Sequence, residues 1–279
     1  MAGSCHTGCF SCGKNVKEEF ILKYEELEFK IPEQCDDYDE CSAFVTASIE
    51  SIMKAAIDSG RNKIIINTNL KLGLPMENIN KVAGPFVEAW AVEVFHDVLE
   101  DKKNRSSLIN VEAKERLYMA DVILQFKKER KKEIGITCEV DVKATAEDIA
   151  SSGKSPNITS FKRIRTAYVE DPDYLFIILS LKHKVYSTKN AATELMDGIM
   201  EVVAYNAYDL KYLSNSDLSY NPALGSGQLQ VRDIHYVTII KRTTWEFCLL
   251  LDRKFINSKK GFDGWLQLAR QNGWIKIND

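Results

Sequence analysis

Apolar side chains in the first hundred residues recur at spacings of three and four, which is the period of an amphipathic α-helix. Two stretches show this period, Cys41–Asp58 and Glu77–Leu99. Ser59 and Gly60 follow the first stretch and provide a helix end. Between the two stretches, Lys63–Asn67 has the composition of a short buried strand. We therefore predict a helix, a strand and a second helix in this part of the chain.

The period changes to two in the middle of the chain, where apolar and polar side chains alternate in Leu117–Phe126 and Ile134–Thr145. Alternation predicts β-strands, and the charged run Lys127–Glu133 is short enough to join them as an antiparallel hairpin. Tyr174–Leu181 is almost entirely apolar, which is typical of a strand buried on both faces. These three strands predict the centre of a sheet.

The remaining pattern adds further elements to this core. In chain order it predicts a loop at Ser151–Asn157, a short basic helix at Ile158–Tyr168, a helix at Ala191–Tyr212, a strand at Leu229–Ile240 and a C-terminal helical region. The predicted fold class is therefore α/β, with a mixed central β-sheet flanked by helices and with helical N- and C-terminal regions.

We find no internal repeat and no linker, so the whole chain, residues 1–279, is expected to form a single domain. Within it, residues 1–40 form a polar segment that contains cysteines, and residues 41–100 form a helical region. Residues 115–182 are expected to form the core sheet, and residues 183–279 a region of helices and strands that covers it.

Composition excludes several classes of protein. The chain is 45% hydrophobic and 10% aromatic, with 14 Gly and 6 Pro, which excludes a mostly disordered or collagen-like chain. No run approaches the roughly 18 continuous apolar residues that a membrane helix needs. The first residues lack the basic and apolar blocks of a signal peptide. We expect a soluble cytoplasmic protein that has no membrane partner.

The net charge of −3 hides an uneven distribution along the chain. Residues 1–60 carry 5 basic and 12 acidic side chains, whereas the rest of the chain carries 32 and 28. Binding to nucleic acid needs a local basic surface, because the field of a charge decays within about 10 Å at moderate salt. The total charge therefore does not exclude a nucleic-acid partner.

The seven cysteines are an odd number, which argues against a disulfide framework and for free thiols or metal ligands. Cys5, Cys9 and Cys12 have the spacing of a cluster-binding loop in radical-SAM enzymes, but the repeated βα barrel of such enzymes is absent from the pattern. A structural Zn²⁺ site is one alternative, with a fourth ligand from His6, Cys35 or Cys41. A tail with free thiols is the other alternative.

The chemistry of the chain is concentrated in the strand Ile136–Thr145. Alternation puts its apolar side chains on one face and Glu139, Asp141 and Lys143 on the other. A solvent-exposed polar face is the simpler interpretation of this strand alone. Asp121, however, lies among apolar residues of the neighbouring strand, where an unpaired carboxylate costs several kcal/mol.

Glu88 adds a further carboxylate among apolar residues of the preceding helix, although an ion pair with a surface lysine explains that residue equally well. Carboxylate oxygens bind Mg²⁺, which shares its shell with phosphate oxygens and acidifies its bound water. A lysine beside such a metal can orient the water, and can help to remove its proton if the pKa of the lysine is depressed.

The order of Asp121, about twenty residues, then Asp141-Val142-Lys143 resembles the PD-(D/E)XK nucleases, the superfamily of most type II restriction endonucleases. The segments 120–123, 141–143, 160–162 and 170–174 are similar to those of HindIII-type restriction enzymes. The resemblance covers roughly residues 80–182. It implies catalytic roles for Asp121, Asp141, Lys143 and Glu88. It also implies a metal site at Asp121, Asp141 and Val142, with Glu139 competing as a ligand. The usual proline before the first aspartate is replaced by Ala120.

The segment after the sheet has the composition of a DNA-contacting surface, with short hydrogen-bonding groups beside cations. The candidate DNA-binding residues are Lys154, Ser155, Asn157, Lys162, Arg163 and Arg165. Arginine and lysine bind phosphates or guanine, and asparagine can pair with adenine. A solvated loop and an exposed basic helix face are the simpler interpretation. Weaker candidates are Gln228, Gln230, Arg232 and Arg242.

These features lead us to expect a sequence-specific, Mg²⁺-dependent endonuclease that cuts double-stranded DNA, of the type II restriction kind, in the bacterial cytoplasm. A homodimer is expected, because two equivalent sites cut a two-fold symmetric target symmetrically. Two alternatives remain open. One is a non-catalytic DNA-binding or zinc-stabilised interaction protein, and the other is a structure-specific repair nuclease of the same fold.

Overall fold

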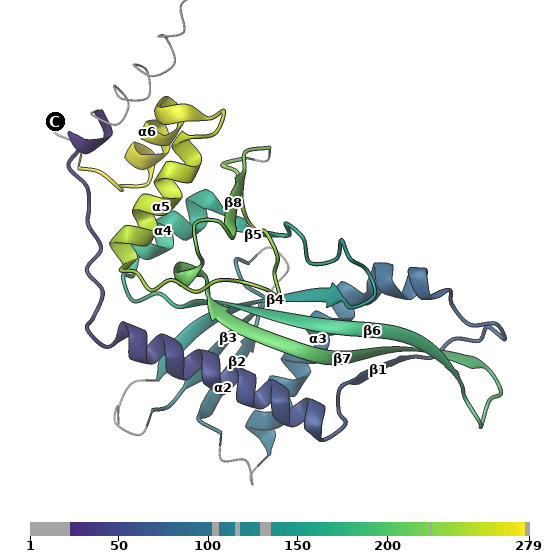
Figure 1. Ribbon diagram of the computed structural model, residues 1–279. Helices are drawn as coiled ribbons and strands as arrows, with labels where there is room; N and C mark the ends of the chain where they lie inside the picture. The colour runs from purple at the N-terminus through teal and green to yellow at the C-terminus, as the bar shows by residue number, and fades with distance from the viewer. Residues whose placement is uncertain (1–22, 102–105, 115–117, 129–134, 224, 277–279) are drawn as a thin grey trace, which may run out of the picture.

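The computed structural model of the chain describes residues 23–101, 106–114, 118–128, 135–223 and 225–276. Its centre is a six-stranded sheet in the order β1-β7-β6-β4-β3-β2. The pair β4 and β6 is parallel, and every other neighbouring pair in this sheet is antiparallel. The sheet is therefore mixed, and helices lie on both of its faces (Figure 1). The predicted fold class is confirmed.

The two predicted N-terminal helices are present as α2 (Tyr38–Asp58) and α3 (Met76–Glu100), with the edge strand β1 (Lys63–Ile66) between them. Both helices bury their apolar stripe against one face of the sheet. Val45 and Phe95 belong to the same core as Val140 and Leu179 of the central strands. The apolar period of three and four thus predicted both the helices and the face that each buries.

The hairpin that alternation predicted is also present. It pairs β3 (Val122–Phe126) with β4 (Ile136–Ala146), and the register places Val122 opposite Val140. Strand β2 (Leu108–Ala113) adds an outer antiparallel neighbour that the pattern did not predict. Strand β3 is shorter than predicted, because Asp121 stands just before its first residue.

The helix predicted at Ala191–Tyr212 is wrong. The structure forms the long strand β7 (Met196–Asp209) there, followed by the short 3-10 helix η1 (Leu210–Tyr212). Strand β7 pairs with β6 (Phe176–Lys189) along its whole length. The free end of this hairpin extends away from the body of the protein (Figure 1). The sheet therefore reaches well beyond the predicted core segment 115–182.

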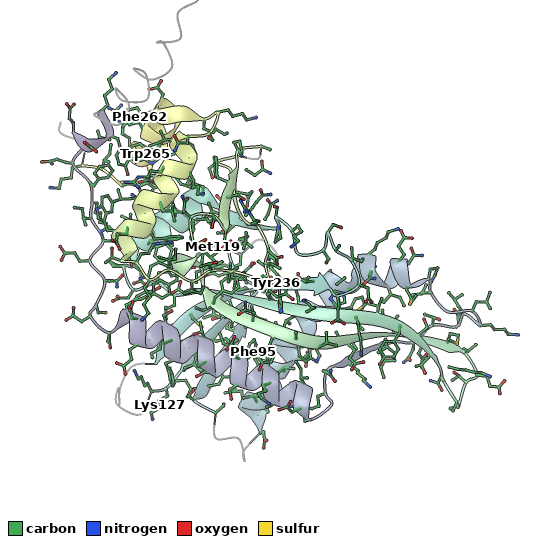
Figure 2. All side chains as sticks on the ribbon, viewed as in Figure 1. Phe95, Met119, Lys127, Tyr236, Phe262 and Trp265 are labelled. Carbon is green, nitrogen blue, oxygen red and sulfur yellow. The ribbon has the colours of Figure 1, made fainter. Side chains whose placement is uncertain are left out.

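The other face of the sheet is covered by α4 (Phe161–Glu170), α5 (Thr244–Ile256) and α6 (Gly261–Gln271). Phe176 and Ile178 of β6 share a core with Tyr168, Phe247 and Trp265 from these helices. Figure 2 shows Phe95 on one side of the sheet and Trp265 on the other. Alternation along β6 thus fills two cores from one strand, which explains why its first part, residues 176–181, is almost entirely apolar.

A second, three-stranded sheet lies on the side of α4–α6 (Figure 1). Its order is β5-β9-β8, with β5 (Asn157–Ser160), β8 (Leu218–Asn221) and β9 (Gln228–Val231). The strand predicted at Leu229–Ile240 is thus confined to a short segment at its start. Among the described residues, no helix has both the length and the apolar character that crossing a bilayer requires.

Candidate active site

The candidate site lies where β3 and β4 begin to separate. Asp121 stands just before β3, and its backbone N–H donates to the carbonyl of Val140 at 3.0 Å. Its side-chain Oδ2 accepts a hydrogen bond from the backbone N–H of Val142 at 2.7 Å. The carboxylate therefore accepts the hydrogen bond that the Val142 N–H would give to the backbone of a longer β3. This local arrangement fixes Asp121 beside the Asp141-Val142-Lys143 segment.

Asp141 and Lys143 lie two residues apart on the same face of β4, as alternation predicted. Lys143 Nζ donates to Asp141 Oδ1 at 2.7 Å and lies 3.4 Å from the carbonyl oxygen of Val142. Asp141 is only 4% exposed, and its second oxygen, Oδ2, has no hydrogen-bond partner in the part of the chain that the structure describes. A buried carboxylate oxygen without a donor is costly and calls for a cation or a proton.

The electrostatics of this pair follow from its burial and its neighbours. Burial raises the pKa of Asp141 to about 7, and the carboxylates of Asp121 and Glu88 act in the same direction against the opposing charge of Lys143. Burial alone lowers the pKa of Lys143, but Asp141, Asp121 and Glu88 outweigh it, so that the pKa is raised overall. These neighbouring carboxylates therefore favour the charged form of Lys143.

Glu88 comes from α3, which packs against the opposite face of the sheet from α4–α6. Its side chain is half-buried, and burial raises its pKa, with the charge of Asp121 adding to the effect and Lys143 opposing it. The charges of Asp121 and Lys143 thus influence the titration of Glu88. The role of Glu88 as a supporting carboxylate stays a prediction.

Glu139 lies on the same strand but has partners of its own. One of its oxygens accepts from the Tyr118 hydroxyl at 2.9 Å, and the other accepts from the Tyr174 hydroxyl at 2.6 Å. Asp141 has one oxygen open, whereas each oxygen of Glu139 is held by a tyrosine. The geometry favours Asp141 over Glu139 as a ligand. Within the described residues, no three His, Cys, Asp or Glu side chains are grouped closely enough to hold a metal ion by themselves.

Comparisons with known proteins bear on what this arrangement does. The family model described as "Type II restriction endonuclease HpaI" matches residues 25–273. The type II restriction enzyme HpaI of Haemophilus parainfluenzae is 56% identical over 256 residues, which cover 91% of this chain and all of that protein. The chain belongs to the HpaI family of type II restriction endonucleases. The predicted enzyme class, a site-specific deoxyribonuclease, is thereby confirmed.

Among solved structures, NlaIV restriction endonuclease matches this HpaI-family chain with a TM-score of 0.40 and 13% identity, covering 80% of this chain and 87% of that one. The resemblance to HindIII-type enzymes and the assignment to the PD-(D/E)XK superfamily stay predictions. Membership of the HpaI family disfavours the non-catalytic alternative.

The candidate DNA-binding residues of this HpaI-family chain are mostly on its surface. Lys154, Ser155, Asn157, Lys162 and Arg163 are exposed. Lys154 forms an ion pair with Asp233, and the backbone N–H of Ser155 donates to the carbonyl of Arg232 at 3.1 Å. These contacts hold the loop before β5 against the segment that follows β9.

Arg165 is the exception, and its prediction as a DNA contact is wrong for this fold. It is fully buried, and its guanidinium donates to both oxygens of Asp252, each at 3.0 Å. Tyr24 donates to the same carboxylate at 2.8 Å, and Trp274 lies against the guanidinium. Arg165 ties α4 to α5 and cannot reach DNA from there.

Arg242 is likewise engaged in structure, because its guanidinium donates to the carbonyls of Lys211 and Leu213 at 2.8 and 2.6 Å. Cys5, Cys9 and Cys12 lie outside the described residues, so the zinc alternative stays a prediction. Of the other suggested ligands, the Cys35 thiol donates to Asp173, and Cys41 is buried on α2.

Sequence reasoning missed a histidine beside the candidate site. Ser180 of β6 lies opposite Lys143 in the parallel ladder, and its hydroxyl is 3.2 Å from His235 Nδ1. Burial lowers the pKa of His235, as does the nearby charge of Lys182. The sequence pattern predicts a continuous strand around His235. It does not indicate that this segment crosses the face of the large sheet that carries Lys143.

Proposed function

We propose that this chain hydrolyses phosphodiester bonds in both strands of DNA at a fixed sequence, as a Mg²⁺-dependent homodimer. The observation that carries the proposal is the buried Asp141 Oδ2, which has no donor among the described residues although Asp121 and Lys143 lie beside it. Membership of the HpaI family supports the reaction class.

The residues present fit a magnesium ion. Mg²⁺ binds hard oxygen ligands, and it is held through one or two carboxylates while keeping several waters and sharing substrate phosphates. Asp121, Asp141 and the carbonyl of Val142 would supply the protein oxygens, with Glu88 as a supporting carboxylate. When bound, the ion would acidify a water and stabilise the charge of the attacked phosphate. Because waters and substrate phosphates complete the coordination, such a site does not need three protein side chains.

Each protein group has a role that its geometry supports. Asp121 is held by the Val142 N–H and keeps its other oxygen for a ligand. Lys143 would orient the attacking water and hold negative charge through its hydrogen bonds. Asp141 positions Lys143 through Oδ1 and offers Oδ2 to the site.

A digest of supercoiled plasmid in the presence of Mg²⁺ tests the proposal. We expect the wild type to give discrete fragments, and we expect Asp141→Ala and Lys143→Ala to lose cleavage by at least about 10³-fold while folding normally. Asp263→Ala and Lys276→Ala, which remove exposed charges elsewhere, serve as matched controls.

The outcomes separate the competing functions. Variants of Asp141 and Lys143 that cut at the wild-type rate would show that the site is misplaced. A smear with no fixed fragments would indicate a structure-specific nuclease. Sequencing the ends of the discrete fragments would give the recognition sequence and the stagger of the cut.

A further inference from the structure

The small sheet β5-β9-β8 has an outward face of unusual composition. Leu229 and Val231 of β9 point into the core, and alternation turns Gln228 and Gln230 outward. The pairing register adds outward neighbours from the two flanking strands. Together the outward side chains are Asn157, Ser160, Ser219, Asn221, Gln228 and Gln230. The face therefore consists of four amides and two hydroxyls.

None of the twelve residues in these three strands is charged, although 28% of the chain is. Cations stand instead at the ends of the strands. Lys162 comes two residues after β5, and Arg232 follows β9 directly; both are exposed. A neutral hydrogen-bonding centre with a cationic rim matches the edge of a DNA groove, where neutral base edges lie between two rows of phosphates.

Two of the amides form an ordered pair at the centre of this face. Gln230 Nε2 donates to Asn157 Oδ1 at 3.0 Å, and the two residues are direct partners in the β5–β9 ladder. An amide nitrogen carries two hydrogens, so Gln230 keeps one donor together with its acceptor Oε1. That combination matches the acceptor N7 and the donor N6 of adenine in the major groove.

The amide pair is connected to the candidate active site by one continuous ribbon. Beyond Gln230, the chain pairs Arg232 with Ser155, and Ile234 N–H donates to the Gly153 carbonyl at 2.9 Å. The next residue, His235, contacts Ser180, which lies opposite Lys143. The labelled Tyr236 marks where this ribbon meets the large sheet (Figure 2).

The length of the ribbon suits recognition beside the cut. Four residues lie between Gln230 and His235, and the chain bends at Arg232 and Ile234, so the two residues are at most about 17 Å apart at roughly 3.3 Å per residue. A turn of DNA measures about 34–36 Å, so this distance is no more than about half a turn. A base read by the amide pair and a phosphate held at Asp141 would therefore lie within one half-site.

We propose that the outward face of the β5-β9-β8 sheet reads the recognition sequence, with Gln230, oriented by Asn157, recognising the adenine of an A·T base pair. The inference rests on the proposed function, because it assigns the specificity of that reaction. Lys162 and Arg232 bind the flanking phosphates and supply affinity without sequence preference.

The test compares cleavage of duplexes that carry the recognition sequence with duplexes in which one base pair is changed. We expect Gln230→Ala and Asn157→Ala to cut the cognate duplex about 10- to 100-fold more slowly and to lose discrimination at one A·T position. Gln230→Glu keeps the size of the side chain but loses the donor, so it should show the same loss. Gln267→Ala, an exposed amide on α6, is the matched control.

A second measurement identifies the contacted atom. Duplexes with 7-deazaadenine lack the N7 acceptor, so the wild type should slow at one adenine, and Gln230→Ala should be insensitive to the same replacement. Unchanged discrimination at every position in the folded variants would overturn the inference, as would a recognition sequence without an A·T pair. A wild type that gives no discrete fragments would instead reject the proposed function.

Discussion

At the residue scale, the difference between Arg165 and its neighbours shows what a sequence can reveal. The buried residues of α4 are Phe161, Ile164, Arg165, Tyr168 and Val169. These positions have the helical spacings of three and four, so Arg165 belongs to the apolar stripe of its own helix. Lys162 and Arg163 fall on the other face. The helical period places Arg165 on the buried face, but its charge suggested a surface position. Its partner Asp252 is 87 residues away, so the local sequence does not indicate the ion pair.

We predict that Arg165→Met destabilises the protein by about 3–5 kcal/mol, because it leaves the buried carboxylate of Asp252 without its counterion. The midpoint of thermal unfolding should fall by roughly 6–20 °C. Arg163→Met, on the exposed face of the same helix, should change it little. The double variant Arg165→Met/Asp252→Leu should recover most of the loss. Full stability in Arg165→Met with weakened DNA binding would contradict this assignment.

Lys211 provides a prediction on pH dependence. Its side chain is fully buried, and burial lowers its pKa to about 8 against the opposing charges of Asp209, Asp39 and Asp173. The unfolded chain has a pKa near 10.4, so it binds more protons than the folded state between these two values. The contribution of Lys211 to stability is therefore most unfavourable below pH 8 and improves as the pH rises to about 10.4.

Lys211→Met removes this dependence. Relative to the wild type, the variant should be most stable below pH 8, and its advantage should decrease by about 1–3 kcal/mol as the pH rises toward 10.4. Urea unfolding at pH 7 and pH 9.5 measures the change, and Lys276→Met is the exposed control. A difference between variant and wild type that does not vary with pH would disprove the lowered pKa.

At the scale of elements, local pattern predicted the helices and the β3–β4 hairpin, but not strand β7. Leu195, Ile199 and Val202 are spaced by three and four, which also suits a helix. The structure instead pairs β7 with β6 over thirteen register positions. Helix period and strand composition compete in such a segment, and pairing with the preceding strand β6, which ends six residues before β7, decides the outcome. The partner strand lies outside the segment, so the apolar spacing within the segment does not reveal it.

The exposed face of α4 gives the prediction at this scale. Lys162→Ala and Arg163→Ala should each weaken binding to duplexes of any sequence, because phosphate contacts carry no sequence information. For each phosphate that a variant no longer binds, the slope of log K against log salt should become shallower by about 1. Binding measured with EDTA over a range of salt concentrations tests this, with Arg270→Ala on α6 as the control. A slope equal to that of the wild type would place this face away from DNA.

At the scale of the whole molecule, the candidate site depends on contacts between distant segments. Motif order predicted Asp121, Asp141 and Lys143, and the hairpin explains why the first two meet. The amide face requires β5, β9 and β8 to align, and β5 lies about sixty residues before the other two. The short strands carry weak periodicity, so only the assembled sheet reveals which amides share a face.

The symmetry of the reaction can be tested without knowledge of the dimer interface. Two equivalent sites, one in each copy, would face the two antiparallel strands of a two-fold symmetric target. We predict that a dimer formed by co-expressing the wild type with an Asp141→Asn copy, each with its own tag, nicks supercoiled plasmid and does not linearise it.

The reason is that the wild-type copy reaches one strand, while the inactive copy holds the other strand at a site that lacks the Asp141 carboxylate. Doubly purified mixed dimers should therefore accumulate open-circular DNA, whereas wild-type dimers from the same purification should give linear product. Linear DNA formed by mixed dimers at half the wild-type rate or faster would mean that one site cuts both strands in turn. In that case two-fold symmetry would not be needed for the double-strand cut, and the homodimer would lose its mechanistic basis.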